Sequence, residues 1–291
     1  NFKLEKEVVD RRTKRLADGG VIFKLGVDVG KDITLAELRS KHDAILVATG
    51  VYKSRELATP GNEAKGVLKA LDYLIAANKV GLGVEVEDFA NGKLNADKKN
   101  VVVIGGGDTA MDCVRTAIRQ GAKSVTCLYR RDRANMPGSQ REVANAEEEG
   151  VKFDWLAAPL SVVEKKGGGA KAVRAVRMRL GPPDASGRQA PEEIAESDYD
   201  VKADMVIKAL GFDPEDLPKH FSESSLTVNR WGGVKVDYRT MMTTMDGVFA
   251  AGDIVRGASL VVWAIKEGRD AAASIDLYRK ARAASARVAA E

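Results

Sequence analysis

The stretch Val101–Arg131 constrains the fold of this chain more than any other part of the sequence. It reads VVVIGGGDTAMDCVRTAIRQGAKSVTCLYRR. The apolar run Val101–Ile104 predicts a parallel strand buried on both faces. It leads through three glycines into a helical pattern that Gly121 ends, and a second strand is predicted over Ser124–Tyr129. The stretch therefore predicts the βαβ unit of a dinucleotide-binding domain.

The glycines of this stretch follow the G-x-G-x-x-A pattern of a pyrophosphate-binding turn. Gly105 allows the tight turn, Gly107 lets the backbone approach a pyrophosphate, and the small Ala110 permits close packing of helix on strand. A helix N-terminus favours an anion because of its unpaired N–H groups and its dipole. The pattern alone is equally compatible with a glycine-rich turn that binds nothing.

Two arginines follow the second predicted strand. A domain that binds NAD carries an acid near this position, which bonds the ribose hydroxyls. Arg130 and Arg131 would instead pair well with a 2′-phosphate. We therefore predict NADP(H) rather than NAD(H). The nearby acid Asp132 argues against this prediction, because an acid near this position is typical of domains that bind NAD. The alternative interpretation of the two arginines is that they lie at a strand end exposed to solvent.

A second pattern of this kind lies near the carboxyl end of the chain. The predicted strand Val248–Ala251 ends at Gly252 and Asp253, on the side where open α/β sheets bind ligands. A carboxylate there can accept hydrogen bonds from a sugar-alcohol chain. Ser259 is a candidate N-cap for a long helix that would point toward Asp253. We expect the buried face of this helix to carry Val261, Ile265, Ala272 and Ile275.

The first hundred residues carry weaker signals. Strands are predicted at Val21–Leu25 and at Asp43–Gly50, which reads DAILVATG, and a helix at Val67–Ala77. The turn at Thr49 and Gly50 is of a kind that passes close to a bound cofactor, although a plain strand-end turn explains it as well. The polar segment 91–100 is a plausible crossing between two domains.

The segment after Arg131 predicts a helix and then strands. Ser139 and Glu142 have capping-box spacing for the start of the helix. Strands dominate from residue 151 to 180, an extended loop is expected at Gly181–Ser197, and a buried strand at Ala203–Gly211.

Composition narrows the classes of function. The chain has 291 residues, 44% hydrophobic and 30% charged, enough for a large core and two domains. Its 46 basic and 42 acidic side chains give a net charge of +4, too balanced to indicate nucleic acid or a membrane surface. No apolar run approaches the ~18 residues of a membrane helix, and the N-terminus has no signal-peptide core. We therefore expect a cytoplasmic protein.

Cysteine and histidine usage is sparse. Cys113 and Cys127 are far apart in sequence, which excludes the close redox-active pair of a disulfide reductase. His42 and His220 match no zinc-ligand spacing. We expect neither a dithiol nor a metal site in this chain.

Taken in order, the motifs resemble a known family. The sequence is similar to the NADPH-dependent glutamate synthase small (beta) chains across essentially its whole length. The motifs that carry this similarity are, in order, ATG, GGGDTAMDC, YRRDRANMPGSQRE, TTMDGVFAAGD and GASLVVWAIKEG. These small chains belong to flavoproteins of the pyridine nucleotide-disulfide oxidoreductase type. The resemblance implies an α/β fold of two Rossmann-like dinucleotide-binding domains, the NADP domain inserted in the FAD domain, with antiparallel β-meander segments. It implies an FAD-binding remainder at 1–99, an NADPH domain at 100–215 and the end of the FAD domain at 216–291.

The resemblance also implies site residues, transferred by position. The residues expected to bind the NADPH pyrophosphate are Gly105, Gly107, Asp108, Thr109 and Ala110. The residues expected to bind the 2′-phosphate are Arg130 and Arg131. Those near FAD are Thr49, Gly50, Gly252 and Asp253, with Asp253 on the ribityl chain, and Ser259, Leu260 and Val261 at a helix start facing the flavin pyrimidine ring. A helix N-terminus there would stabilise the charge of reduced flavin. No catalytic side chain is predicted, because hydride chemistry belongs to the cofactors.

The chain departs from the family pattern in one respect. It contains a single G-x-G-x-x-A, whereas the family also has an FAD fingerprint preceded by a cysteine-rich iron–sulfur domain. We therefore expect this sequence to be the carboxyl-terminal part of a longer protein. The remaining part would hold the FAD pyrophosphate and the 4Fe-4S clusters.

The resemblance implies an NADPH-oxidising subunit of glutamate synthase. Hydride would pass from NADPH to FAD, and electrons would continue through iron–sulfur clusters to the large (alpha) subunit, supporting L-glutamate formation from glutamine and 2-oxoglutarate. A related electron-input subunit for ferredoxin or pyrimidine reduction is an alternative. A non-catalytic nucleotide-binding module is another.

Overall fold

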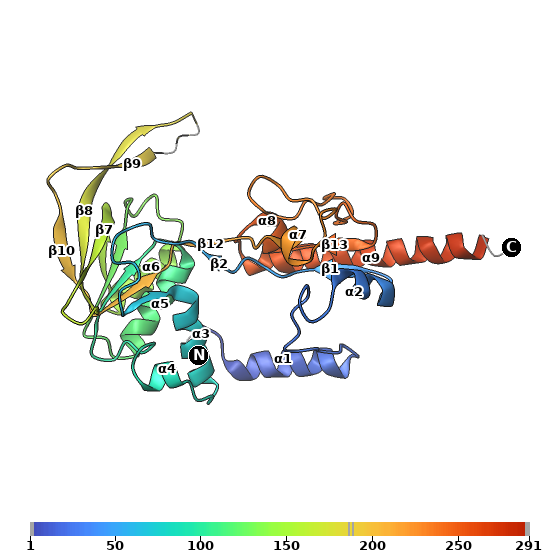
Figure 1. Cartoon of the computed structure of the whole chain (residues 1–291), viewed down its shortest axis with the longest axis horizontal. Helices are drawn as coiled ribbons and strands as arrows, with labels where there is room; N and C mark the ends of the chain where they lie inside the picture. Colours follow the sequence, from blue (N-terminus) through green and yellow to red (C-terminus); the bar gives the residue numbers. More distant parts are fainter. Residues whose placement is uncertain (1–2, 186, 188, 289–291) are drawn as a thin grey trace. The chain divides into compact units, whose positions relative to one another are not determined.

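The computed structural model describes residues 3–185, 187 and 189–288. The chain forms two compact units, which we describe separately (Figure 1). The first comprises residues 1–12 and 54–211, and the second residues 13–53 and 212–291. Most of the first unit is thus inserted between two segments of the second. The segment 91–100 lies inside the first unit, so the crossing that we expected there is wrong, and the chain passes between the units near residues 53 and 211 instead.

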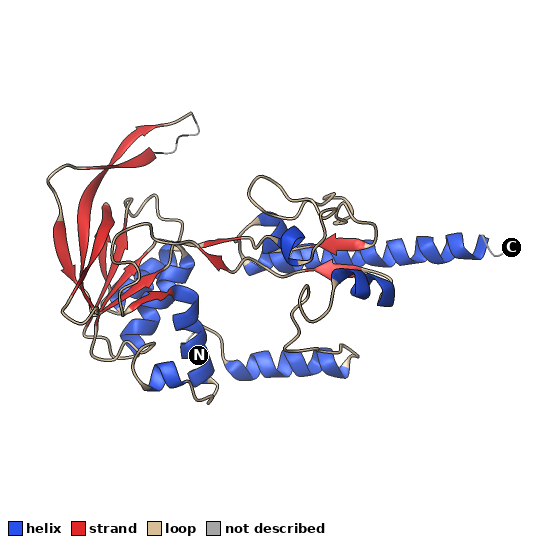
Figure 2. Ribbon diagram, in the orientation of Figure 1, coloured by secondary structure: helices blue, strands red, loops and turns tan. Residues whose placement is uncertain are grey.

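The first unit is built on a five-stranded parallel sheet with the strand order β3-β11-β4-β5-β6. Figure 2 draws the strands in red and the helices in blue. The strands are β3 (Val67–Lys69), β4 (Asn100–Ile104), β5 (Ser124–Tyr129), β6 (Lys152–Trp155) and β11 (Met205–Lys208). All five residues of β4 are buried, as its apolar sequence predicts. Alternation along β4 sends Val101 and Val103 into one core cluster, and Val102 and Ile104 into another.

Helices cover one face of this sheet. They are α3 (Ala70–Gly81), α5 (Asp108–Arg119) and α6 (Gln140–Glu148), and the short helix α4 (Glu87–Ala90) packs on α3. Tyr73 of α3, Met111 of α5 and Val143 of α6 share a core cluster with Val101 and Val103. The helix expected over Val67–Ala77 is wrong at its start, because Val67–Lys69 pair with β11 as an edge strand and α3 begins at Ala70.

Antiparallel strands cover the other face. They are β7 (Ala157–Glu164), β8 (Ala170–Pro183), β9 (Gln189–Glu193) and β10 (Tyr199–Lys202), in the order β10-β8-β7 with β9 also on β8. Val162 and Val173 of this layer pack in one cluster with Val102 and Ile104. The extended loop expected at Gly181–Ser197 is wrong, since β8 continues to Pro183 and β9 pairs with it. Residues 186 and 188 of that segment lie outside the described part.

The second unit contains a parallel pair of short strands. These are β1 (Ile45–Val47) and β13 (Val248–Ala250). Its helices are α2 (Leu35–Lys41), α7 (Leu217–His220), α8 (Asp253–Arg256) and α9 (Val261–Val288), while α1 (Lys6–Asp18) begins in the first unit and ends in the second. A further pair joins β2 (Lys53–Ser54) and β12 (Phe212–Asp213). The strand expected at Val21–Leu25 is wrong: none of the described strands includes it, and Leu25 is 87% exposed.

The face of α9 that is buried differs from the expected one. Val261, Ile265 and Ala272 are exposed, and of the expected set only Ile275 packs in a core cluster. The buried positions are Glu267 and Ala271, and Ala271 packs against Phe249 of β13. Glu267 and Ala271 lie one turn apart on this face, which the hydrogen bond from the Gly252 N–H to the Glu267 carboxylate turns toward the end of β13. Apolar spacing alone therefore selected the wrong face.

None of the helices in the described ranges combines the length and the apolar character that crossing a membrane requires.

Candidate functional site

The turn after β4, which we call the glycine loop (Gly105–Gly107), has a backbone that excludes side chains at its first residue. Gly105 has φ +146°, and a Cβ built on it would lie 2.1 Å from the carbonyl oxygen of Ala209. The thiol of Cys127 donates a hydrogen bond to the Gly105 carbonyl at 3.3 Å. Strand β11 and strand β5 therefore hold this turn from two sides.

The other two glycines differ in their surroundings. A Cβ on Gly106 would lie 2.3 Å from Cε2 of Tyr129, so the tyrosine ring covers this residue. Gly107 is the N-cap of α5, and a Cβ on it would meet no atom within 4 Å. No side chain of the described residues caps the helix there. The N-terminus of α5 therefore has space beside Gly107 and no side-chain cap, a geometry that suits an anion, and the binding of a pyrophosphate there stays a prediction. Sequence reasoning missed the contact of Gly106 with Tyr129, although an aromatic residue at the end of the next strand is a usable signal.

Arg130 and Arg131 follow β5, which lies beside β4 because Leu128 pairs with Ile104. The structure thus brings them to the same sheet edge as the glycine loop. The Nε atom of Arg131 is buried and has no hydrogen-bond partner among the described residues. A buried guanidinium N–H without a partner is costly, and a phosphate oxygen would satisfy it.

The acid beside these arginines is engaged elsewhere. The carboxylate of Asp132 accepts hydrogen bonds from the backbone N–H and the side-chain amide of Asn135, at 2.9 and 2.8 Å. This turn also receives the Tyr129 hydroxyl, which donates to the Asn135 carbonyl at 3.1 Å. Asp132 therefore shapes the loop after β5. The residues present fit a 2′-phosphate, and the preference for NADP(H) stays a prediction.

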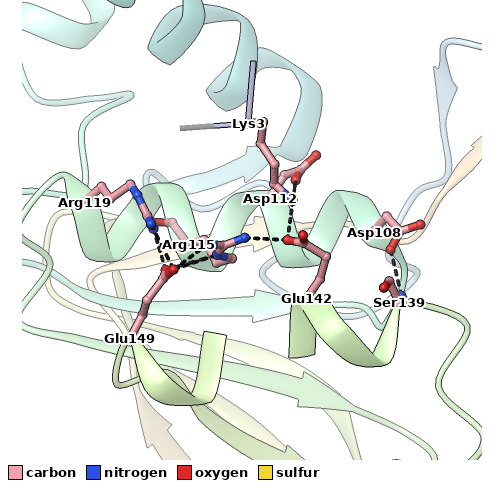
Figure 3. A network of polar contacts seen from close by, with 8 residues as sticks. All are labelled: Lys3, Asp108, Asp112, Arg115, Arg119, Ser139, Glu142 and Glu149. Atoms are coloured by element: carbon pink, nitrogen blue, oxygen red, sulfur yellow. Dashed lines mark hydrogen bonds and ion pairs between the residues drawn. The ribbon is translucent and has the colours of Figure 1, made fainter. Parts of the chain in front are cut away.

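Asp108 and Thr109 form the first turn of α5, and Ala110 is fully buried behind them. The Asp108 carboxylate accepts a hydrogen bond from the backbone N–H of Ser139 at 2.9 Å (Figure 3). Beside it, the N–H of Gly138 donates to the carbonyl of Gly106 at 2.9 Å. Asp108 thus fastens the start of α6 to the glycine loop. This arrangement indicates a structural use of its side chain, which its position in the motif did not reveal.

A network of charged side chains joins α5 to α6 (Figure 3). The Arg115 side chain is only 10% exposed, and its Nη2 lies 2.6 Å from Oε1 of Glu149. Its Nη1 donates to Oε2 of Glu142 at 2.6 Å, while Arg119 also pairs with Glu149. The predicted capping box is therefore wrong: α6 forms after Ser139, but the Ser139 side chain makes no capping hydrogen bond and Glu142 turns to Arg115.

This network predicts loss of stability in acid. The guanidinium groups of Arg119 and Arg115 lower the pKa of Glu149 from 4.5 to about 2. A lowered pKa contributes stability that is fully present above pH 4.5 and is lost as the pH falls toward 2. We expect the free energy of unfolding to fall by on the order of 3 kcal/mol over this window from Glu149 alone. Urea titrations between pH 7 and 2.5 measure it.

The matched variants are Glu149→Gln and Glu148→Gln, because Glu148 is the exposed neighbour of Glu149. Glu149→Gln should flatten the acid part of the stability curve, and Glu148→Gln should leave it as in the unchanged chain. Equal curves for all three proteins would contradict the assignment.

The second unit gathers the other predicted residues at one edge. Because β1 and β13 run parallel with Val47 opposite Ala250, the residues that follow each strand lie on the same side. These residues are Thr49 and Gly50 after β1, and Gly252 and Asp253 after β13. The structure therefore brings these two turns to one sheet edge, and their role at FAD stays a prediction.

The turn after β13 is fixed by a buried acid. The Glu267 side chain is 5% exposed, accepts a hydrogen bond from the Gly252 N–H at 2.9 Å, and pairs with Arg256. Burial raises the pKa of Asp253, and the nearby Glu267 carboxylate raises it further, while a backbone hydrogen bond from Ser259 opposes this. Sequence reasoning missed Glu267, because a charged residue in an exposed-looking helix gives no signal of burial.

The start of α9 lies open. Helix α9 begins at Val261, so Leu260 rather than Ser259 precedes it, and the proposed N-cap at Ser259 is wrong. Leu260 is 60% and Val261 71% exposed. Ser259 instead contributes its backbone to the Asp253 carboxylate. These three residues adjoin the turn as predicted, and two of them present apolar surface.

The two cysteines pack in the core of the first unit. Cys113 and Cys127 are both buried, and burial raises the pKa of both thiols, that of Cys127 to about 12. Among the described residues, no three His, Cys, Asp or Glu side chains are grouped so as to hold a metal ion.

Comparison with known proteins places these features in context. Residues 4–268 match the pyridine nucleotide-disulphide oxidoreductase family. The chain is 64% identical to the glutamate synthase (NADPH) small chain of Azospirillum brasilense, over 100% of this chain and 60% of that protein. It is 45% identical to the small chain of Escherichia coli (strain K12), over 94% of this chain and 58% of that one. The chain therefore spans about 60% of the length of these curated relatives.

Among solved structures, the chain is similar to Mycobacterium tuberculosis FprA in complex with NADPH. The TM-score is 0.74 at 16% sequence identity, over 97% of this chain and 73% of the FprA chain. This likeness concerns the fold and confirms the expected α/β class.

Proposed function

The chain belongs to the pyridine nucleotide-disulphide oxidoreductase family, and on this premise we propose that it works as the NADPH-oxidising part of a glutamate synthase small chain. In this proposal it binds NADPH in the first unit and contributes to an FAD site in the second. Electrons then leave through iron–sulfur clusters in the remaining part of the protein to a large subunit that forms L-glutamate. The 64% identity to the Azospirillum brasilense small chain supports this choice of reaction.

One observation carries the NADPH assignment. The uncapped N-terminus of α5 and the two arginines after β5 lie at the carboxyl edge of adjacent strands, and the Nε atom of Arg131 is buried without a partner among the described residues. We propose that Gly107, Thr109 and the backbone of the first turn of α5 hold the pyrophosphate. Gly105 and Ala110 give the turn its shape, Asp108 anchors it to α6, and Arg130 and Arg131 bind the 2′-phosphate.

The second unit supports a flavin site of matching character. We propose that Thr49, Gly50 and Gly252 bring backbone close to FAD and that Asp253 accepts hydrogen bonds from its ribityl hydroxyls. Ser259, Leu260 and Val261 would adjoin the pyrimidine ring, where the N-terminus of α9 favours negative charge. FAD supplies the chemistry by accepting hydride from NADPH, while this chain binds and orients the cofactors. The buried cysteines favour an electron exit that uses no dithiol.

An anaerobic absorption experiment tests this function. The chain is supplied with FAD, separated from free flavin, and mixed with NADPH or with NADH at the same concentration. We expect NADPH to bleach the bound flavin rapidly and NADH to do so more slowly. Bound flavin that NADPH leaves unchanged would contradict the hydride step. A chain that retains no FAD would show that the flavin site also needs the FAD pyrophosphate contacts expected in the remaining part of the protein.

A further inference from the structure

A cavity of about 380 Å³ lies in the first unit, at the ends of β3 and β11. It is lined by Glu56, Glu63, Lys69 and Lys208, among other residues. Lys208 is the last residue of β11 and Lys69 the last of β3, so the cavity lies at the carboxyl edge of the sheet. This is the edge at which open α/β sheets bind their ligands.

At the wall of this cavity, two ammonium groups hold the Glu56 carboxylate. Oε2 of Glu56 lies 2.6 Å from Nζ of Lys208, and its Oε1 lies 3.2 Å from Nζ of Lys69. The Lys208 side chain is only 6% exposed, whereas that of Glu56 is 52% exposed. The lysines lower the pKa of Glu56, with Lys208 as the larger cause. Glu56 is thus an ionised, fixed and accessible hydrogen-bond acceptor.

The sheet order relates this cavity to the glycine loop. Along the carboxyl edge the order β3-β11-β4-β5 gives Lys69, Lys208, the glycine loop and Arg130 in turn. The N–H of Ala209, the residue after Lys208, donates a hydrogen bond at 2.8 Å to the carbonyl of Ile104, the residue before Gly105. Since neighbouring strands lie about 4.8 Å apart, the end of β3 is roughly 10 Å from the end of β4.

A dinucleotide bound at this edge has a defined direction. Its 2′-phosphate at Arg130 and its pyrophosphate at the glycine loop lie over β5 and β4, so the half that remains extends toward β11. That half contains the nicotinamide ribose, which is the ribose of NADPH that keeps both the 2′- and the 3′-hydroxyl. An acid that accepts hydrogen bonds from ribose hydroxyls is the usual way in which dinucleotide domains hold a ribose.

We propose that the Glu56 carboxylate accepts hydrogen bonds from the hydroxyls of the nicotinamide ribose, with Lys208 as the residue that positions it. This inference rests on the proposed binding of NADPH. It adds a contact for the half of the cofactor that the fingerprint and the arginines do not hold. Lys208 acts through Glu56, because its own side chain is almost completely buried.

The test compares two ligands on the full chain. NADPH contains the nicotinamide half, and 2′,5′-ADP lacks it but keeps the 2′-phosphate. We expect Glu56→Gln to lower the affinity for NADPH about tenfold in a calorimetric titration, since a charge-assisted acceptor becomes neutral, and to leave the affinity for 2′,5′-ADP unchanged.

Lys208→Met should lower the affinity for NADPH by a similar factor. The double variant should bind NADPH as tightly as either single variant, because both changes act on one contact.

Two controls separate this role from a general loss of structure. Glu63→Gln makes the same substitution in the same cavity, and Lys99→Met removes a half-buried lysine elsewhere in the unit; neither should change the ratio of the two affinities. No change in Glu56→Gln, or an equal loss for NADPH and 2′,5′-ADP, would overturn the inference. If the unchanged chain bound neither ligand, the proposed function itself would fail, and this contact with it.

Discussion

Replacing Gly105 with alanine is expected to destabilise the chain by about 3–5 kcal/mol, at the upper end of what single substitutions do. The new Cβ would lie 2.1 Å from the Ala209 carbonyl oxygen, and neither strand backbone can move away without breaking the sheet. The positive φ of +146° adds backbone strain for any residue with a side chain. Urea unfolding followed by circular dichroism measures the change.

Gly107→Ala is the matched control two residues away. A Cβ at Gly107 meets no protein atom within 4 Å, and its φ of −91° suits alanine. We expect the free energy of unfolding to fall by about 1 kcal/mol or less, because alanine is the poorer N-cap by an amount of this order. NADPH affinity should nevertheless fall at least tenfold, since the methyl group occupies the approach of the pyrophosphate. Similar destabilisation by both substitutions would refute this account of the loop.

Replacing Arg130 and Arg131 together with serine is expected to remove the preference for NADPH. Each charge-assisted contact to a 2′-phosphate is worth about 1.5–3 kcal/mol, or roughly 10- to 100-fold in affinity. NADH lacks this phosphate, so its affinity should change little. Isothermal titration of the variant with NADPH and with NADH measures both effects on the same preparation.

Arg133→Ser provides the control for that experiment. Arg133 lies in the same loop, but Glu147 pairs with it at 2.9 Å. We expect this variant to keep the NADPH preference of the unchanged chain. If the double variant kept the preference too, the assignment of Arg130 and Arg131 to the phosphate would be wrong.

Parts of the fold that depend on neighbouring residues in sequence could be predicted from the sequence. Strand β4, helix α5 and strand β5 follow from an apolar run, a glycine turn and a helical period, all within about thirty residues. The shared edge of Gly105 and Arg130 follows as well, because successive strands of a βαβ unit run parallel. Strands ending near Gly50 and Gly252 were predicted in the same way, whereas their parallel pairing appears only in the structure.

Parts that depend on distant partners could not be predicted. Val67–Lys69 has helical spacing but becomes a strand because β11, far away in sequence, offers an edge. Strand β9 is polar, and its pairing with β8 includes an ion pair between Arg179 and Glu192 at 3.1 Å rather than apolar burial. Glu142 does not cap α6 as expected, because its carboxylate accepts a hydrogen bond from the guanidinium group of Arg115.

The same limit applies to the candidate site. The types of residue at the edge of the site could be read from the sequence. Three of its features depend on loop conformations that the sequence does not reveal: the buried Nε of Arg131, the ring of Tyr129 over Gly106 and the hydrogen bond from the Ser139 N–H to Asp108. The anchoring of Gly252 by Glu267 likewise depends on a helix face that apolar spacing placed incorrectly.

The most direct test of the central claim is the ratio of the dissociation constants for NADPH and NADH on the unchanged chain, measured by isothermal titration at one ionic strength. An open helix N-terminus beside two arginines predicts that NADPH binds at least tenfold more tightly. The preference should weaken as salt is added, because the ions screen the attraction between the arginines and the 2′-phosphate. Equal affinities for the two nucleotides would contradict the claim that this sheet edge is an NADPH site.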